Sequence, residues 1–331
     1  MRGSRSYSVV LLPVLVLFVH TSAAPRARGG EGARIGLRLR AGVGEFYSFQ
    51  LSMVTEEGGT WGAPGGKGDG VLVTLKTVEF IEGRMVILGV ADGVPTSAKI
   101  VFDPKVSTSQ DFCYGGVSRQ KREVWALAGK AVTVTRRDNQ VEHDLPYAVE
   151  DRDRDLLGLL LQMNNFFLPK EAVEIGSQWD VKQEDVPGYY GKYYNSKDGR
   201  SSLYCKLAKV EEVGTKRIAH IAVRLAKRID GQDAKGKGDY EGWVLVDLAN
   251  GTTSVRLDGK TEDQTMAISS DGVARSKVVL AGKDRRESRI VYAGKSETGG
   301  RIAEFPHTPP SPAKDGKEAE PEDPGNRPRR K

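Results

Sequence analysis

The sequence predicts a mainly β fold, in which a curved antiparallel sheet, half-barrel-like and either single or duplicated, wraps around one central apolar helix. Three observations support this fold class. Apolar and polar residues alternate over most of the 331-residue chain, which is typical of half-buried strands. Glycine-containing turns separate the alternating runs. One leucine-dense segment in mid-chain has helical spacing instead, and it is too apolar to lie on a surface.

The N-terminus has the three-part pattern of a cleavable secretory signal. Arg2 and Arg5 give a short positive region, residues 9–19 are almost wholly apolar, and small residues precede a predicted cut between Ala23 and Ala24. The apolar run is shorter than the roughly 20 residues that span a bilayer. We therefore expect a secreted or periplasmic protein with no transmembrane segment in its mature chain.

Before the helix, the alternation predicts strands joined by tight turns. The predicted strands cover 35–40, 47–53, 71–80, 85–90, 124–127 and 131–135, and a Gly-rich loop covers 58–70. Two of these strands form a hairpin that turns at Glu82 and Gly83, because a short turn between alternating runs indicates a hairpin. A second hairpin turns at Gly129 and Lys130.

The one strong helix is predicted over residues 152–168. Asp151, Asp153 and Asp155 place negative charge in its first turn, where the helix dipole favours it, and Pro169 is expected to end it. Its apolar residues extend over most of the circumference: Leu156, Leu157, Leu159, Leu160, Leu161, Met163, Phe166, Phe167 and Leu168. Leaving them in water would cost about 25 cal/mol per Å², so the sheet is expected to cover the helix.

After the helix, strands resume. One predicted hairpin joins 202–210 to 217–225, and another joins 242–247 to 253–258 across Asn250-Gly251, a strong tight-turn signal. Further strands are predicted over 261–268, 277–280 and 289–292. The chain then changes to glycine, proline and charged residues, a composition typical of disorder.

The predicted organisation is a signal peptide (1–23), a flexible N-terminus (24–32), a β-rich domain (33–294) and a disordered tail (295–331). Two stretches of the β-rich domain resemble each other, VGEFY before the helix and IGSQW after it. An approximate duplication, with repeats over 33–145 and 170–294 on either side of the helix, would explain this similarity. Chance similarity between two sets of hairpins would explain it as well.

No stretch of the sequence has the complete pattern of a metal, nucleotide or nucleophile site. Leu156 and Gln162 stand where a calcium loop beginning at Asp151 would need glycine and a carboxylate. Residues 231–237 have phosphate-loop spacing, but Gly238 follows in place of Ser or Thr. The separate histidines of the body and the lack of a Gly-x-Ser-x-Gly sequence point away from zinc and from a nucleophile elbow. We expect no cofactor, no metal and no catalytic residue.

Charge and cysteine usage limit the partners further. The net charge of +6 is spread over the chain, whereas nucleic-acid binding needs a clustered basic face. We therefore expect no nucleic-acid partner. The two cysteines, Cys113 and Cys205, could form one disulfide in an oxidising compartment or remain separate thiols.

Three stretches of the body carry a family resemblance: VGEFYSFQL, FLPKEAVEIGSQWDV and LVDLANGTTSVRLDG. The chain resembles bacterial exported or envelope proteins of a domain-of-unknown-function family, and its predicted architecture is similar to periplasmic lipoprotein-carrier half-barrels. That family has no assigned catalytic residues, so the resemblance implies none here. A shared architecture alone implies no function.

The leading functional hypothesis is an exported, non-catalytic binding protein that holds a lipid or another apolar small molecule, or contacts an envelope protein. The candidate ligand-binding residues lie on the helix and in a tyrosine-rich loop: Leu156, Leu160, Met163, Phe167, Tyr189 and Tyr190. One alternative is a structural or protein-interaction module that uses the tyrosine-rich loop and the charged tail. A second alternative is a hydrolase with an unrecognised carboxylate site, because 44 acidic residues could meet in pairs anywhere on the fold.

Overall fold

The computed structural model of the chain describes residues 34–62, 70–137, 140–191, 199–230, 234–268 and 274–295. The predicted signal peptide (1–23), the N-terminal segment (24–32) and residues 296–331 of the predicted tail lie outside the described residues. Those assignments therefore stay predictions. Among the described residues, no helix is both long enough and apolar enough to cross a membrane.

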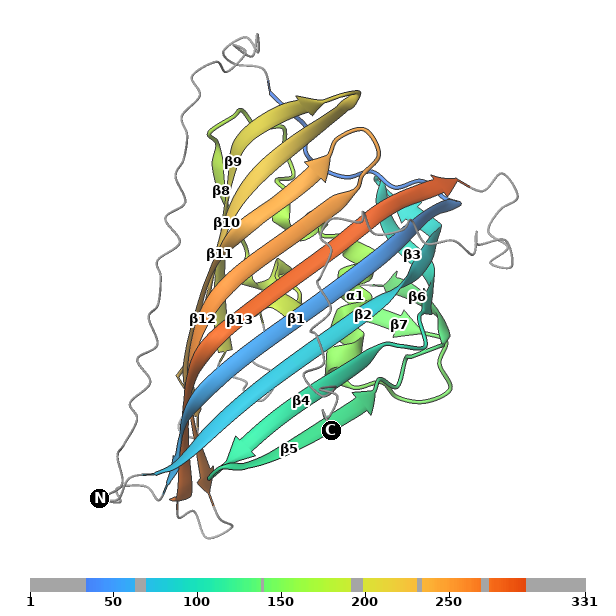
Figure 1. The fold of residues 1–331 in the computed structure, drawn as a ribbon. Helices are drawn as coiled ribbons and strands as arrows, with labels where there is room; N and C mark the ends of the chain where they lie inside the picture. Colours follow the sequence, from blue (N-terminus) through green and yellow to red (C-terminus); the bar gives the residue numbers. More distant parts are fainter. Residues whose placement is uncertain are drawn as a thin grey trace, which may run out of the picture. The chain divides into compact units, whose positions relative to one another are not determined.

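One large antiparallel, curved, open sheet dominates the described residues (Figure 1). Its strands before the helix are β1 (Glu45–Gly62), β2 (Val71–Ala91), β3 (Val94–Phe102), β4 (Ser107–Tyr114), β5 (Val117–Val124), β6 (Ala131–Arg137) and β7 (Gln140–His143). Those after it are β8 (Gln178–Val181), β9 (Gly199–Val213), β10 (Lys216–Asp230), β11 (Ala234–Asp247), β12 (Thr253–Ile268) and β13 (Ala274–Lys295). The predicted fold class is confirmed.

The two halves of the chain meet in the middle of the sheet. The strand order is β7-β6-β3-β2-β1-β13-β12-β11-β10-β9-β8, and the β4–β5 hairpin attaches to β2. The first half starts at the centre and proceeds outward, whereas the second half starts at an edge and proceeds inward. β1 pairs with β13 along its whole length, from Glu45 opposite Lys295 to Gly62 opposite Lys277. The duplication of 33–145 and 170–294 stays a prediction.

β2 is one continuous strand, so the predicted turn at Glu82 and Gly83 is wrong. The chain turns ten residues later, at Asp92 and Gly93, where both residues have positive φ angles of 50° and 77°. Gly83 is needed for close packing instead. A Cβ at this position would lie 2.6 Å from Cζ of Phe49 and 2.3 Å from a backbone oxygen of β3. A glycine inside a strand can therefore mark a close approach rather than a turn.

Other strand boundaries also differ from the prediction. Residues 35–40 form no strand beyond one bridge from Ile35 to Val173, and residues 58–62 of the predicted loop belong to β1. The predicted strand 124–127 is largely a turn. The short strands predicted after residue 261 are parts of β12 and β13. The hairpins 202–210 with 217–225 and 242–247 with 253–258 are confirmed, although their strands are longer.

The helix α1 (Asp151–Gln162) ends earlier than predicted. Met163 and Asn164 have left-handed φ angles of 52° and 63°, and a short 3₁₀ helix, η1 (Asn165–Phe167), follows. The Asn164 amide is buried and donates to Thr253 Oγ1 and Ser288 Oγ, both at 3.1 Å. Asparagine tolerates the left-handed conformation better than most residues. This buried polar anchor, and not Pro169, ends the helix.

The core lies between the sheet and the segment that includes α1. α1 lies against one face of the sheet, which we call the inner face, and β3, β6 and β7 curl around it (Figure 1). Its five leucines are fully buried. The 3₁₀ helix η2 (Gln183–Asp185) and the short helix α2 (Gly188–Gly191) follow β8. Tyr190 of α2 donates to Ser288 Oγ at 3.0 Å, so α2 and Asn164 are fixed to the same serine.

Replacing Asn164 with alanine should lower the free energy of unfolding by roughly 2 to 4 kcal/mol. The change leaves buried hydroxyl groups without their partner and places a less tolerant residue in a left-handed conformation. Urea unfolding followed by tryptophan fluorescence measures the loss. The exposed Gln120→Ala on β5 is the control and should change stability by about 0.5 kcal/mol or less. Equal effects of the two changes would contradict this role of Asn164.

Candidate functional site

The inner face of the sheet changes from apolar to charged along its strands. On β1, the inward residues Tyr47, Phe49 and Leu51 are buried and apolar, whereas Thr55 and Glu57 follow with polar side chains. Alternate residues of a strand share a face, so this change occurs within one surface. Neighbouring strands change at matching register positions, which places a band of ionisable groups next to the apolar core.

A cavity of about 470 Å³ lies over this band. Its walls come from β1, β2, β10, β12 and β13, from the start of α1, and from Tyr189 and Tyr240. Six acidic residues line it: Glu57, Glu79, Glu150, Asp151, Asp263 and Asp284. Three basic side chains accompany them: Arg152, Lys227 and Arg286. The cavity is therefore a charged chamber beside the apolar core.

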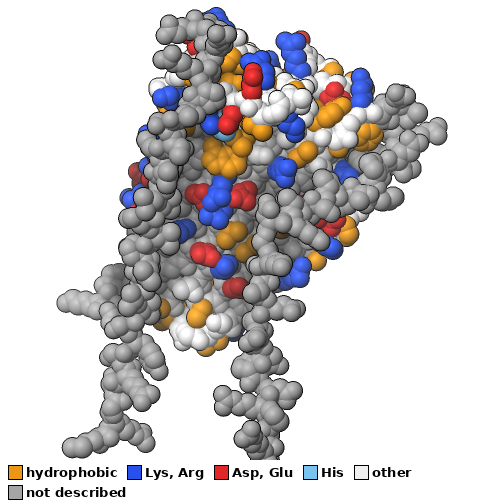
Figure 2. Space-filling view, turned by 45° about the horizontal axis from the view of Figure 1, so that its top comes forward, with side chains coloured by type: hydrophobic (Ala, Val, Ile, Leu, Met, Phe, Trp, Pro, Cys, Tyr) orange, Lys and Arg blue, Asp and Glu red, His pale blue; other side chains and the backbone are white. Residues whose placement is uncertain are grey.

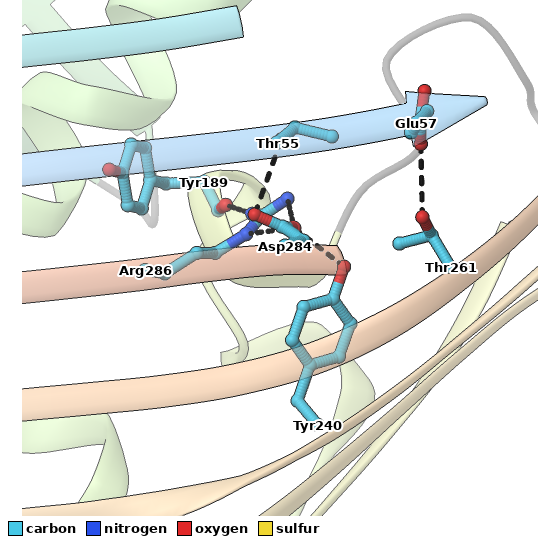
Figure 3. Close-up of polar contacts among 7 residues, drawn as sticks. All are labelled: Thr55, Glu57, Tyr189, Tyr240, Thr261, Asp284 and Arg286. Carbon is cyan, nitrogen blue, oxygen red and sulfur yellow. Dashed lines mark hydrogen bonds and ion pairs between the residues drawn. The ribbon is translucent and has the colours of Figure 1, made fainter. Parts of the chain in front are cut away.

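Asp284 is the centre of the polar contacts in this chamber (Figure 3). Its carboxylate accepts hydrogen bonds from Tyr240 OH at 2.7 Å, from Arg286 Nε at 2.9 Å and from Thr55 Oγ1 at 3.3 Å. Arg286 also donates to the backbone oxygen of Tyr189. One carboxylate thus connects β1, β11 and β13, and its arginine partner connects them to α2.

The attraction between Asp284 and Arg286 keeps both side chains ionised. Burial raises the pKa of Asp284, but the charges of Arg286 and Lys227 and the Tyr240 hydrogen bond outweigh it, so the pKa is held below its usual range. Burial lowers the pKa of Arg286, but Asp284 outweighs that effect and raises it. Both groups are therefore ionised, which favours strong charge-assisted hydrogen bonds.

Glycines on the inner face leave room for these contacts to cross a strand. Gly259 lies between Tyr240 and Asp284 in the register, and a Cβ there would lie 2.2 Å from the Tyr240 ring. Gly282 lies between Glu57 and Thr261, whose side chains hydrogen-bond at 3.0 Å over it (Figure 3). Side chains from two strands that are not neighbours can meet here, because the strand between them has a glycine at that position.

One wall of the chamber joins the start of α1 to β2. Arg152 forms an ion pair with the buried Glu79, and its guanidinium lies 4.3 Å from the ring centroid of Trp125. Burial raises the pKa of Glu79, although the charge of Arg152 opposes the shift. Trp125 is held in turn by a hydrogen bond from its Nε1 to Thr108 Oγ1, 2.6 Å long.

Two further carboxyl groups of the chamber, those of Asp263 and Glu57, are easier to protonate than usual. Burial and the nearby charge of Glu57 raise the pKa of Asp263 to about 6, with Lys227 opposing. Burial also raises the pKa of Glu57, with its Thr261 hydrogen bond opposing and Asp284 adding to the rise. Perturbed carboxyl groups that share a cavity are typical of functional sites.

Four buried polar atoms of the chamber have no hydrogen-bond partner among the described residues. Three can accept a hydrogen bond: Oε2 of Glu79, the hydroxyl of Tyr189 and Oδ1 of Asp263. The fourth is Nη2 of Arg152, which is ion-paired with Glu79. Glu79 and Tyr189 are only 3% and 4% exposed. Buried polar groups are normally paired, so these atoms are exceptions in an otherwise well-paired interior.

The sequence-predicted ligand residues lie mainly outside this chamber. Leu156, Leu160, Met163 and Phe167 are buried in the core, and Tyr190 packs against Phe167 with ring centroids 5.4 Å apart. Tyr189 alone among the six candidates lines the cavity. The helix stripe thus contributes its surface to packing within the protein.

Sequence reasoning missed the charged residues of the chamber, although β10 contained a signal. Its inward residues Ile221, Val223 and Leu225 are apolar, and Lys227 interrupts the series before Ile229. A lysine within a series of buried apolar residues is rare unless it has a function or a charged partner. Most of the other charged residues of the chamber belong to strands that are far apart in sequence. Only the pairing of these strands in the sheet brings them together.

The disulfide between Cys113 and Cys205 is not formed, and both are free cysteines. Cys113 lies in β4, which pairs with β2 and β5, whereas Cys205 lies in β9, which pairs with β8 and β10. The two strands belong to opposite halves of the sheet. Burial raises the pKa of the Cys205 thiol far above its usual value, in keeping with a core residue.

Basic and acidic side chains are mixed on the face of the molecule shown in Figure 2. Among the side chains coloured there, Lys and Arg lie next to Asp and Glu and form no patch of a single sign. Within the described residues, no group of three or more His, Cys, Asp or Glu side chains could hold a metal ion.

Comparison with known proteins leaves the chain without an assigned family. No protein-family model matches it, and no curated protein matches it. Among solved structures, it is similar to a structure described as "Lipid-protein interactions in lipovitellin", at 11% sequence identity and a TM-score of 0.38. The match covers 78% of this chain and 26% of that one, so this chain spans about a quarter of the other's length. At that level of likeness, neither ligand nor function is transferable.

Asp263 should titrate near pH 6 and should make the protein less stable as the pH rises through that range. Its folded pKa of about 6 exceeds the unfolded value of about 3.9, so the folded state holds the proton more tightly between these values. The free energy of unfolding therefore falls from about pH 4 to pH 6. Asp263→Asn should remove this contribution to the decrease in the free energy of unfolding. Urea unfolding at several pH values measures it.

The control for this titration is Asp230→Asn, because the Asp230 side chain is 86% exposed. This variant should keep the pH dependence of the wild-type protein. If Asp263→Asn follows the wild-type curve as closely as Asp230→Asn does, Asp263 is not buried as described.

Proposed function

We propose that the protein is an exported binding protein that holds a small, uncharged, hydroxyl-rich molecule in the chamber around Asp284. The observation that carries the proposal is the set of unpartnered buried atoms on Glu79, Tyr189 and Asp263. Export rests on the predicted signal in residues 1–23. Ligand pockets of about 300–1,000 Å³ with a few convergent polar groups are typical of small-molecule sites, and this cavity lies in that range.

The free atoms favour a ligand that donates hydrogen bonds. An ionised carboxylate oxygen only accepts, and a tyrosine hydroxyl both donates and accepts. Glu79 and Asp263 therefore present acceptors, and Tyr189 can serve either role. Hydroxyl groups on a ligand would match this set, because each hydroxyl supplies a donor and also accepts.

The two ion pairs of the chamber favour an uncharged ligand beside them. Asp284 is already balanced by Arg286, and Glu79 by Arg152. A charged ligand would bring a further buried charge without a matched partner, which is costly. The rings of Tyr189 and Tyr240 line the same space and offer apolar faces on which the carbon skeleton of such a ligand can pack.

The chamber changes the kind of ligand expected from the sequence. A lipid held between helix and sheet would use Leu156, Leu160, Met163 and Phe167, which the core already occupies. The proposed ligand instead contacts polar atoms beyond the start of α1. The protein-interaction alternative rests on the tyrosine-rich loop and the charged tail. Tyr189 and Tyr190 of the loop are both buried, and residues 296–331 of the tail lie outside the described residues.

A second candidate function is acid-assisted hydrolysis. The observation in its favour is that Asp263 has a pKa of about 6 and shares the chamber with Glu57. A carboxyl group with a raised pKa suits the general acid of a glycosidase. Release of alcohol from a panel of alkyl glycosides, whose leaving oxygen needs a proton, abolished in Asp263→Asn, would favour hydrolysis. Turnover that is equal in the variant would exclude Asp263 as the acid.

Two neighbouring tyrosines give a matched test of the binding proposal. Tyr189→Phe removes a hydroxyl without a partner, so it should leave the stability unchanged or slightly higher and should remove the bound molecule. Tyr190→Phe removes the hydrogen bond to Ser288, so it should cost about 1 kcal/mol and should keep the bound molecule. Native mass spectrometry of protein purified from its own host reads out the ligand, and urea unfolding reads out the stability.

Three outcomes would count against the proposal. Wild-type protein that carries no bound molecule would contradict it, and so would equal retention of the molecule by Tyr189→Phe. Recovery of a lipid in an organic extract of the purified protein would support the apolar-ligand hypothesis instead.

A further inference from the structure

Lys227 is a buried amine that the proposed binding function does not use. It lies on the inner face of β10, it is 2% exposed, and it lines the chamber. None of the ion pairs among the described residues includes it. Its Nζ lies 5.0 Å from the centroid of the Tyr240 ring. Arg286, the other cation that faces Tyr240, is paired with Asp284.

We propose that Lys227 binds the carbonyl group of the ligand covalently, as a reversible imine. The ligand would then be a small hydroxyl-bearing aldehyde or ketone, such as the open-chain form of a sugar. This inference rests on the proposed function, because it assumes that a hydroxyl-rich molecule enters the chamber.

The cavity that Lys227 lines, about 470 Å³ in volume, leaves room for such a group. Its register partner on β11 is Gly238, where a Cβ would lie 2.8 Å from the Tyr240 ring. Tyr240 therefore lies over a strand segment without side chains. The amine faces Tyr240 of β11, Asp263 of β12, and Asp284 and Arg286 of β13. These side chains surround the space into which a carbonyl carbon would come.

The electrostatic surroundings make the amine a better nucleophile than an exposed lysine. Burial lowers the pKa of Lys227 well below its usual range, and the charge of Arg286 adds to this effect, while Asp284 and Asp263 oppose it. A lysine that is desolvated or next to another cation is activated in this way. A larger fraction of Lys227 is therefore neutral at a given pH.

The proposed step is a condensation that releases water. The lone pair of Nζ attacks the carbonyl carbon, and the π electrons of the carbonyl move to its oxygen, which takes up a proton. Loss of that oxygen as water, with transfer of a second proton to it, leaves a carbon–nitrogen double bond. The amine and the carbonyl thus give an imine and water, with no change of oxidation state. Asp263, whose pKa is about 6, is placed to give and regain a proton.

A purely structural role explains Lys227 less well. Burying an ammonium group costs several kcal/mol unless it is paired, and a leucine or methionine would continue the apolar series of β10. The preceding inward residues Ile221, Val223 and Leu225 do so. The amine thus stands at a position where a structural residue would be apolar.

Reductive trapping tests the proposal on the full-length protein. Glycolaldehyde with cyanoborohydride, at about pH 6, should add a single hydroxyethyl group to Lys227, because exposed lysines with a pKa near 10.4 remain protonated there. Peptide mapping should show labelling at Lys227 at least about tenfold above that at the exposed Lys209. Lys227→Arg should lose the label, and Lys209→Arg should keep it.

The outcomes separate this proposal from the binding function. If the peptide map of the wild-type protein shows labelling spread over exposed lysines with no preference for Lys227, the imine proposal is wrong. This outcome does not depend on whether the variants fold. If Lys227→Met still carries the host-derived molecule in native mass spectrometry, while the wild-type protein shows no selective label, binding stands and the imine fails. Protein that carries no molecule in either form speaks against the binding function itself.

Discussion

The interior of this protein depends on the ion pair between Asp284 and Arg286. Both side chains point to the inner face of β13, in the middle of the sheet, where Asp284 is 3% exposed and the Arg286 side chain is 12% exposed. A buried pair is stable only if further hydrogen bonds complete it. Tyr240 and Thr55 supply them to Asp284, and the backbone of Tyr189 accepts from Arg286. The pair thereby connects both halves of the sheet to the segment that covers it.

The position of this pair marks a division of the inner face. On one side, α1, η1 and α2 cover apolar residues and complete the core. Asn164 and Tyr190 fix this cover to Ser288, two residues from Arg286 along β13. On the other side, the cover ends at the start of α1, and the adjoining band of the inner surface is charged. The cavity exists because the helical segment is too short to cover the whole sheet, and its charge suits a polar occupant.

The sequence predicted the fold class well, because alternation, tight turns and one apolar helix are local signals. Asn250-Gly251 located a real turn, whereas Glu82-Gly83 did not, since Gly83 makes room for Phe49 and has no turn to form. The helix end was also missed, because the reason for it lies on β12 and β13, about 90 and 124 residues away in sequence. The pairing of β1 with β13 could not be derived, since nothing local joins the two ends of the domain.

The candidate site was harder to predict than the fold, for the same reason. Its carboxylates and cations lie on five strands and one helix, and each looks like an ordinary surface charge in its own segment. Lys227 was the exception, since it stands in an apolar series. Glycines such as Gly259 and Gly282 added to the difficulty, because they let side chains meet across an intervening strand. The alternation of apolar and polar residues does not predict such contacts.

The most direct test of this account compares two aspartates that each bind arginine, one inside the chamber and one on the outer face. Asp284 is 3% exposed, whereas the Asp258 side chain, bound to Arg256 and Arg285, is 48% exposed. By urea unfolding, Asp284→Asn should lose about 3–5 kcal/mol, because it leaves Arg286 buried without its partner. Asp258→Asn should lose about 1 kcal/mol or less. Similar small losses for both variants would contradict the central role of the Asp284–Arg286 pair.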